Sequence, residues 1–176
     1  MIFKNTKIAG VYLLEPERIT DDRGFFARMW CQTEFTEHGI DSRVVQCNLS
    51  FNPRKGTLRG MHYQRAPYEE TKIVRCTMGA VFDVAVDLRR DSPTFKQWVG
   101  APLTAENREM LVIPPGCAHG YLTLTDNAEV SYQMSAYYAP NHGAGVRWND
   151  PAFDIRWPGD VTLIAARDGN YPDFTS

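Results

Sequence analysis

The stretch KIVRCTMGAVFDVAVDL, residues 72–88, decides the fold. Two runs rich in Val, Ile, Phe and Thr, residues 72–78 and 80–88, are separated only by a glycine, a pattern typical of neighbouring strands. Similar runs recur between Gly, Pro, Asn and Asp punctuation at residues 44–51, 57–64, 109–114, 119–125 and 128–138. No long helical period interrupts them. The pattern predicts an all-β protein, a barrel or jelly roll with a few short helices.

The clearest helix candidate is TEFTEHG, residues 33–39. Thr33 would be its N-cap and Gly39 would end it. The chain has 176 residues and shows no linker, repeat or low-complexity segment. Residues 1–176 are therefore expected to form a single domain.

Charge and hydropathy exclude several classes of protein. A formal net charge of -2 gives no field that would favour nucleic acid or an anionic membrane surface. No segment approaches the roughly 20 apolar residues of a membrane helix, and the first residues lack the apolar core of a signal peptide. We expect a cytoplasmic protein without nucleic-acid or membrane partners. The four cysteines lie singly in mostly apolar settings and are expected to be reduced and buried: Cys31, Cys47, Cys76 and Cys117.

Two motifs are similar to the metal-binding motifs of cupins, G-x5-H-x-H-x(3,4)-E and P-x-G-x2-H. The stretch GTLRGMHYQ, residues 56–64, supplies His62, and Glu69 follows at the spacing of the glutamate. The stretch PPGCAH, residues 114–119, supplies His119. Gln64 stands where the second imidazole should be, and a neutral amide is a poor ligand for zinc, iron or copper. The sequence therefore favours a cupin framework without a metal, and a metal-dependent oxygenase is the alternative.

Without a metal, His62 is suited to accept a proton near neutral pH. A base of this kind needs a carboxylate that fixes its tautomer, and Asp83 and Asp168 are candidates. Lys72 and Tyr132 could stabilise charge or donate a proton. Each has a structural explanation as well, because Asp83 could lie on a solvated face, Lys72 could be a solvated strand end and Tyr132 could be a core residue.

Eight motifs together carry a resemblance to a known family. They are DDRGFF (21–26), QCNLS (46–50), GTLRGMHYQ (56–64), KIVRC (72–76), VFDVAVDLRRDSPTF (81–95), LTAENREMLVIPPGCAHGYLTL (103–124), YQMSAYY (132–138) and RWNDPAFDIRWP (147–158). In this order, the chain resembles the dTDP-4-dehydrorhamnose 3,5-epimerase family of metal-free cupins.

The resemblance implies a homodimer that uses no cofactor and inverts C3 and C5 beside the ketone of a dTDP-linked 4-keto-6-deoxyhexose. It makes His62 the base, Asp168 its partner and Asp83 a carboxylate close behind the imidazole. Lys72 would stabilise the enolate oxygen, and Tyr132 would return a proton from the opposite face. Positions that would surround the nucleotide diphosphate or the sugar are Arg23, Phe26, Gln46, Asn48, Arg59, His119 and Tyr138.

Two features do not fit the family pattern smoothly. Arg59 and His62 are an odd number of residues apart, so an ideal strand would point them to opposite faces. We therefore expect a bulge near Gly60. Arg28 stands where the family usually has a glutamate, and Ala165 and Arg167 replace a usual serine and lysine. An epimerase that inverts one centre, or a sugar-nucleotide binding module without catalysis, remain alternatives.

Overall fold

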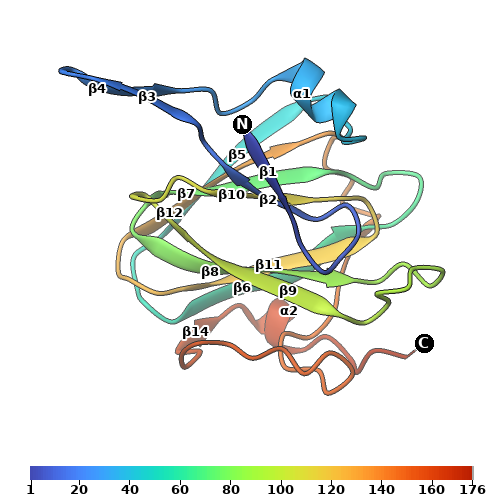
Figure 1. The fold of residues 1–176 in the computed structure, drawn as a ribbon. Coiled ribbons are helices and arrows are strands. Elements are labelled where there is room, and N and C mark those ends of the chain that lie inside the picture. Colours follow the sequence, from blue (N-terminus) through green and yellow to red (C-terminus); the bar gives the residue numbers. More distant parts are fainter. Residues whose placement is uncertain (176) are drawn as a thin grey trace.

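The computed structural model describes residues 1–175 and shows two β-sheets stacked face to face (Figure 1). The first sheet has the order β1 (Ile2–Asn5), β2 (Tyr12–Glu15), β10 (Met110–Ile113), β7 (Lys72–Met78), β12 (Ala128–Met134) and β5 (Gln46–Asn52). The second has the order β13 (Gly143–Gly145), β6 (Thr57–Gln64), β11 (Cys117–Thr123), β8 (Ala80–Asp87) and β9 (Trp98–Thr104). The strands of each sheet pair antiparallel in this order, and β14 (Leu163–Ile164) adds to β6 in parallel.

Three smaller elements lie outside these two layers. The strands β3 (Arg18–Asp21) and β4 (Gly24–Ala27) form a hairpin that projects away from the sheets at the upper left of Figure 1. The helices α1 (Gln32–Glu37) and α2 (Ala166–Gly169) are both short. The all-β jelly roll with a few short helices is thus confirmed. No helix in residues 1–175 is long and apolar enough to cross a membrane.

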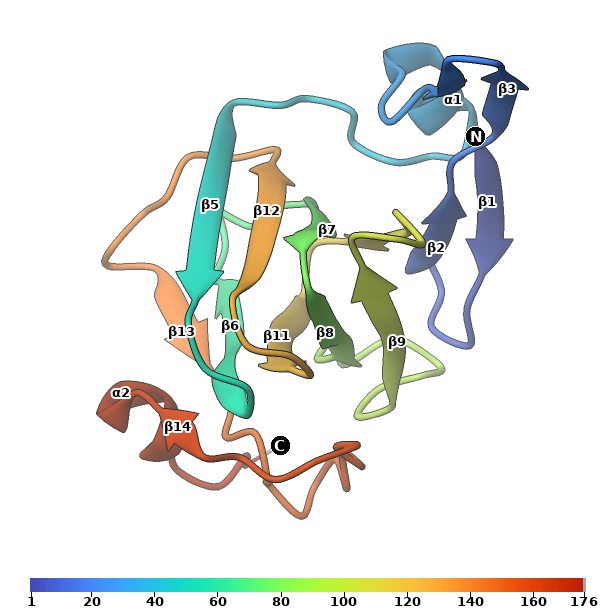
Figure 2. The same ribbon diagram turned by 90° about the vertical axis from the view of Figure 1, so that its left-hand side faces the viewer.

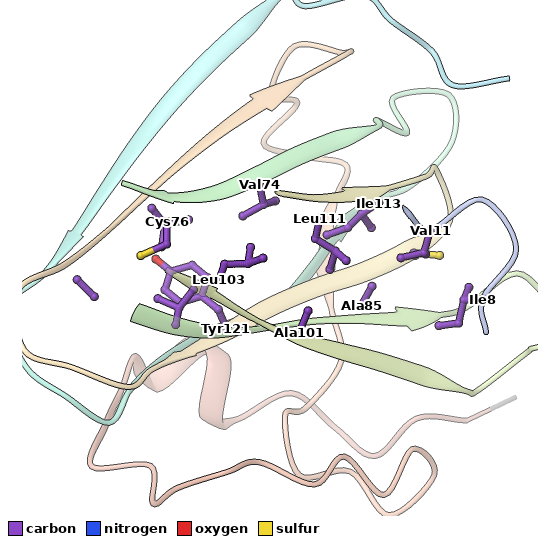
Figure 3. Packing of buried hydrophobic residues seen from close by; sticks show 14 residues of the cluster. Ile8, Val11, Val74, Cys76, Ala85, Ala101, Leu103, Leu111, Ile113 and Tyr121 are labelled. Atoms are coloured by element: carbon purple, nitrogen blue, oxygen red, sulfur yellow. The ribbon is translucent and has the colours of Figure 1, made fainter. Parts of the chain in front are cut away.

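The main core lies between the sheets, with Val74 and Leu111 facing Ala85, Ala101 and Tyr121 (Figure 3). The chain after β13 runs under the second sheet, as Figure 2 shows, and buries its other face. Strand β8 is therefore covered on both sides, which explains its nearly continuous apolar sequence.

Burial on both sides of β8 decides how Asp83 should be interpreted. Asp83 shares the inward face of the strand with Val81, Ala85 and Asp87, and each of the four is 0% exposed. The alternative that Asp83 lies on a solvated face of the strand is therefore wrong.

Several boundaries differ from the sequence prediction. The expected strand over 128–138 ends at Met134. The short strands β1 to β4, β13 and β14 and the longer strand β9 were not predicted. The helix α1 has Cys31 rather than Thr33 at its N-cap, with no side-chain cap, whereas Gly39 ends the helical segment at a φ of 70° as expected. Strands of two to four residues carry weak local signals, which explains why the short ones were missed. In β9, Gly100 and Pro102 interrupt the pattern typical of a strand.

The four cysteines are free, as predicted. Cys76 and Cys117 are buried, and burial raises the pKa of their thiols to about 11 and about 12. The expected burial is wrong for Cys47, which is exposed, and only partly right for Cys31, which is half-buried.

Replacing Asp87 with asparagine is expected to lower the free energy of unfolding by about 2–4 kcal/mol at pH 7. The Asp87 carboxylate is buried, which favours its neutral form. Hydrogen bonds from Arg89 at 2.8 Å, Ser92 and Thr94 at 2.7 Å outweigh burial and lower its pKa to about 2. An asparagine would lose the charge and turn an amide N–H toward these donors.

The pH dependence provides a second check of the Asp87 prediction. Because the folded-state pKa lies below the ordinary value of 3.8, the stabilisation is fully present above about pH 4 and is lost as pH falls through about 2. In urea unfolding, the free energy of unfolding of D87N should thus be lower than that of the wild type at pH 7. The difference should shrink progressively as the pH falls below about 4. Asp91→Asn, at an exposed position of the same loop, is the matched control. Equal stability of D87N and D91N at pH 7 would contradict the prediction.

Candidate active site

Two cavities of about 420 Å³ and about 380 Å³ adjoin each other at one end of the barrel interior. Both are lined by His62, Lys72 and Tyr132, which sequence analysis nominated as the reacting groups. His62 lies on β6 of the second sheet, whereas Lys72 and Tyr132 lie on β7 and β12 of the first. The two sheets therefore present these side chains to a shared space from opposite sides.

An irregularity in β6 allows Arg59 and His62 to serve one cavity. The pairing of β6 with β11 shifts register between His119 and Tyr121, and both Arg59 and His62 line the first cavity. Gly60 lies at the shift with a φ of 118°, and a Cβ atom there would lie 2.5 Å from the Cα of Gly120. Only glycine fits this conformation and this close approach. The predicted irregularity at Gly60 is confirmed.

His62 and Asp168 form a hydrogen-bonded pair, with His62 Nε2 2.7 Å from Asp168 Oδ1. The other carboxylate oxygen accepts the Gly60 N–H at 3.1 Å, so α2 is tied to the irregular part of β6. Burial opposes the charge on Asp168, but the hydrogen bonds from His62 and Gly60 outweigh it and lower the pKa of Asp168. Because a carboxylate only accepts, Nε2 carries a proton and Nδ1 keeps a lone pair. This is the arrangement of a positioned base.

Lys72 and Tyr132 supply the other two polar groups that the cavities share. The Lys72 Nζ donates to the backbone oxygen of His62 at 3.3 Å and lies 3.0 Å from Glu70 Oε1. Burial raises the pKa of the Tyr132 phenol, an effect that the positive charge of Arg59 only partly offsets. The phenol therefore keeps its proton at neutral pH and can act as a donor.

Asp83 is hydrogen-bonded to His119 and not to His62, so its alternative assignment as the carboxylate partner of His62 is wrong. Its Oδ1 lies 2.8 Å from Nε2 of His119, and both side chains are buried. His119 is the direct cross-strand partner of His62, so the two imidazoles lie side by side with separate carboxylates. Asp83 faces the core from β8 and reaches the strand next to it rather than β6.

The predicted substrate-binding residues divide into two groups. Arg59 and His119 line the first cavity, and Gln46, Asn48 and Tyr138 line the second. Arg23 and Phe26 lie on the projecting hairpin and line neither cavity. The Arg23 side chain is 90% exposed and pairs with Asp21 at 2.6 Å. Within one chain the hairpin residues therefore lie outside both cavities, and their contact with the substrate stays a prediction.

The ligand set of the alternative metal-dependent cupin is not assembled. Gln64 donates its amide to the backbone oxygens of Tyr68 and Tyr137 and accepts from Ala139 N–H. Glu69 is exposed on the loop before β7. Across residues 1–175, no three His, Cys, Asp or Glu side chains gather in a way that could hold a metal ion.

Sequence reasoning missed several residues of the cavities. Glu70 and Arg167 line the second cavity, and Tyr121 lines the first, where its hydroxyl contacts Ser50 at 2.9 Å. Strand alternation could have identified Glu70. It lies two residues before Lys72, and residues two apart in an extended chain point to the same side. Arg28, the departure noted above, is exposed, pairs with Glu34 at 3.1 Å and lies outside both cavities.

Comparison with known proteins places this site in a family. The family model described as dTDP-4-dehydrorhamnose 3,5-epimerase matches residues 5–176. The chain belongs to this family. A dTDP-4-dehydrorhamnose 3,5-epimerase of Escherichia coli K12 is 48% identical over 161 residues, which cover 90% of this chain and 86% of the relative.

Solved structures of the family share the fold. The dTDP-4-dehydrorhamnose 3,5-epimerase of Elizabethkingia anophelis superposes with a TM-score of 0.96 at 34% identity, covering 99% of this chain and 96% of that one. A 3'-monoepimerase of Streptomyces bikiniensis in complex with dTDP-quinovose has a TM-score of 0.88 at 34% identity, covering 96% and 85%. The shared fold thus carries epimerases that act on one centre as well as on two.

Proposed function

We propose that the chain is an epimerase that inverts C3 and C5 of a dTDP-4-keto-6-deoxyhexose, as in dTDP-rhamnose biosynthesis. The observation that carries this proposal is the meeting of the His62–Asp168 pair, Lys72 and Tyr132 around one interior space. Inversion of a centre beside a ketone uses three functions: a base, a cation that stabilises the enolate oxygen and an acid on the opposite side. The family and its 48%-identical E. coli relative support the same reaction.

The steps follow from the geometry. Nδ1 of His62 takes the proton from C5 or C3, the C–H electron pair forms the enolate double bond, and O4 becomes negative. Asp168 stabilises the imidazolium, and the Lys72 ammonium stabilises O4 in a site where charge is weakly screened. The Tyr132 hydroxyl then protonates the same carbon from the other sheet's side, which inverts the centre. The phenolate regains a proton from solvent and the His62 imidazolium releases one to solvent, which restores both groups.

The rest of the two cavities suits a nucleotide diphosphate attached to the sugar. Arg59 can hold a phosphate through paired N–H groups, and Nε of Arg59 is fixed by Asn52 Oδ1 at 2.7 Å. Gln46, Asn48 and Tyr138 offer amides and a phenol beside the second cavity. The proposed site therefore combines a cation for the phosphates with amide and phenol groups for the polar parts of a dTDP-sugar.

The test is proton exchange in deuterated water, with dTDP-4-keto-6-deoxyglucose as substrate and NMR detection at C3 and C5. Deuterium at both carbons, with formation of the inverted sugar, is the expected result. Exchange at neither carbon would overturn the proposal. Exchange at one carbon would establish the second candidate, a single-centre epimerase, which the likeness to the S. bikiniensis 3'-monoepimerase favours.

Two chains are proposed to form a homodimer in the cytoplasm, each with residues 1–176 as one catalytic domain. Exposed apolar side chains on the hairpin and on the outer face of β5 support an interface, namely Ile19 at 70%, Phe26 at 66% and Leu49 at 62% exposure. A dimer would also give Arg23 and Phe26 a partner subunit to contact. The free cysteines and a nucleotide-linked substrate favour the cytoplasm.

Light scattering after gel filtration should give twice the 20.0 kDa mass of one chain. Replacing Leu49 with aspartate is expected to shift the protein to the mass of one chain, because a charge would be buried at the interface. The matched control is Leu163→Asp, an exposed leucine on β14, which should leave the mass unchanged. A monomeric wild type would contradict the homodimer.

A further inference from the structure

Glu70 is a buried carboxylate beside the reacting groups. Its side chain is 3% exposed, and Oε1 lies 3.0 Å from Lys72 Nζ. Its second oxygen, Oε2, is buried and has no hydrogen-bond partner anywhere in residues 1–175. A buried charge is unfavourable unless it is paired, so this carboxylate should have a role beyond the fold.

The backbone around Glu70 is held firmly. Thr71, the residue between Glu70 and Lys72, donates its N–H to Ser135 Oγ at 2.8 Å and accepts the Ser135 N–H at 3.0 Å. This double contact fixes the start of β7 against the end of β12. Glu70 and Lys72 therefore point to one side, and both line the second cavity.

The contacts of Lys72 account for two of its three N–H groups. One is directed to Glu70 Oε1 and one to the backbone oxygen of His62. The third remains for an oxygen in the cavity, and two fixed partners define its direction. Of the two carboxylates in this region, Glu70 contacts Lys72, whereas Asp168 is bound to His62 and Gly60.

We propose that Glu70 is a positioning residue, which holds the Lys72 ammonium in place and directed at the ketone oxygen of the substrate. This inference rests on the proposed function and adds a residue to it. The contact matters because the Lys72 side chain is only 10% exposed and shares its cavities with Arg59 and Arg167, two cations that repel its ammonium. A carboxylate 3.0 Å away holds the ammonium in position against this repulsion.

The test replaces Glu70 with glutamine, which keeps the shape and removes the charge. We expect kcat to fall about 10- to 100-fold, with KM changed by less than about threefold, because the lost interaction acts on the enolate oxygen more than on the bound ground state. Glu69→Gln is the matched control, since Glu69 is exposed and lines neither cavity, and its kinetics should equal those of the wild type.

A double-mutant cycle with Lys72→Met separates positioning from a general structural role. If Glu70 acts through Lys72, E70Q should cause no further loss of kcat in the K72M background. K72M leaves the Glu70 carboxylate buried without its cation, so K72M/E70Q should have a higher Tm than K72M. The comparison of Tm values does not depend on enzymatic activity, so it tests the inference even if E70Q alone folds poorly.

Three outcomes would overturn the inference about Glu70: wild-type kcat in E70Q, a raised kcat in E70Q, or the same loss of kcat from E70Q with and without Lys72. The inference and the proposed function fail in different ways. Wild-type protein that exchanges neither C3 nor C5 would defeat the function itself. Wild-type protein that exchanges both, while E70Q behaves like E69Q, would defeat the role of Glu70 alone.

Discussion

Replacing His62 with asparagine is expected to lower the rate of proton exchange at both C3 and C5 by about 10³-fold, within the range for loss of a general base. Asparagine has neither the lone pair of Nδ1 nor the ability to carry the proton as a cation. The tie between α2 and β6 should persist through the hydrogen bond from the Gly60 N–H to Asp168. The measurement is deuterium incorporation at each carbon, compared with the wild type at one substrate concentration above KM.

A second substitution separates His62 itself from its partner. Asp168→Asn should reduce exchange by about 10²-fold or more, because a neutral amide cannot stabilise the imidazolium and can favour the wrong tautomer. His142→Asn is the matched control, since its ring packs beside Tyr68 and lines neither cavity. Exchange at C3 and C5 that survives in H62N at the wild-type rate would show that another group is the base.

The irregularity of β6 at Gly60 is a feature of the site that could be predicted from the sequence. The odd offset between Arg59 and His62 is incompatible with one cavity on an ideal strand, and the intervening Gly60 marks where the strand must deviate. Local chemistry was sufficient here, because alternation and the freedom of glycine are properties of the chain itself. The bounds of β6 and β7 were predicted correctly, since Gly56 precedes the first strand and Gly79 follows the second.

Contacts between distant strands could not be derived in this way. The sequence is equally compatible with Asp83 as the partner of His62 or of His119. Only the strand order β6-β11-β8 places Asp83 beside His119. Asp168 was assigned to His62 by the family resemblance, since no spacing rule relates residues 106 apart in the chain. Glu70 was overlooked because Glu69 matched a motif, although alternation with Lys72 pointed to its neighbour.

Tyr132→Phe is expected to uncouple inversion from proton exchange. His62 can still remove a proton in this variant and return one to the same face, so deuterium should enter C3 and C5 at a rate within about tenfold of the wild type. Inversion requires a proton from the other side of the carbon, and phenylalanine has none to give. Formation of the inverted sugar should therefore fall by about 10²- to 10⁴-fold, the range for loss of a general acid.

The position of Tyr132 makes this separation interpretable. The ring lies on β12 and packs against the core, so phenylalanine can keep the packing and remove only the hydroxyl. Burial raises the pKa of this phenol, which keeps the wild-type residue in its donor form at neutral pH. Tyr137→Phe is the matched control, because Tyr137 is 69% exposed and lines neither cavity. If Y132F lost exchange and inversion to the same extent, Tyr132 would bind substrate, and the acid on the second face would have to be another group.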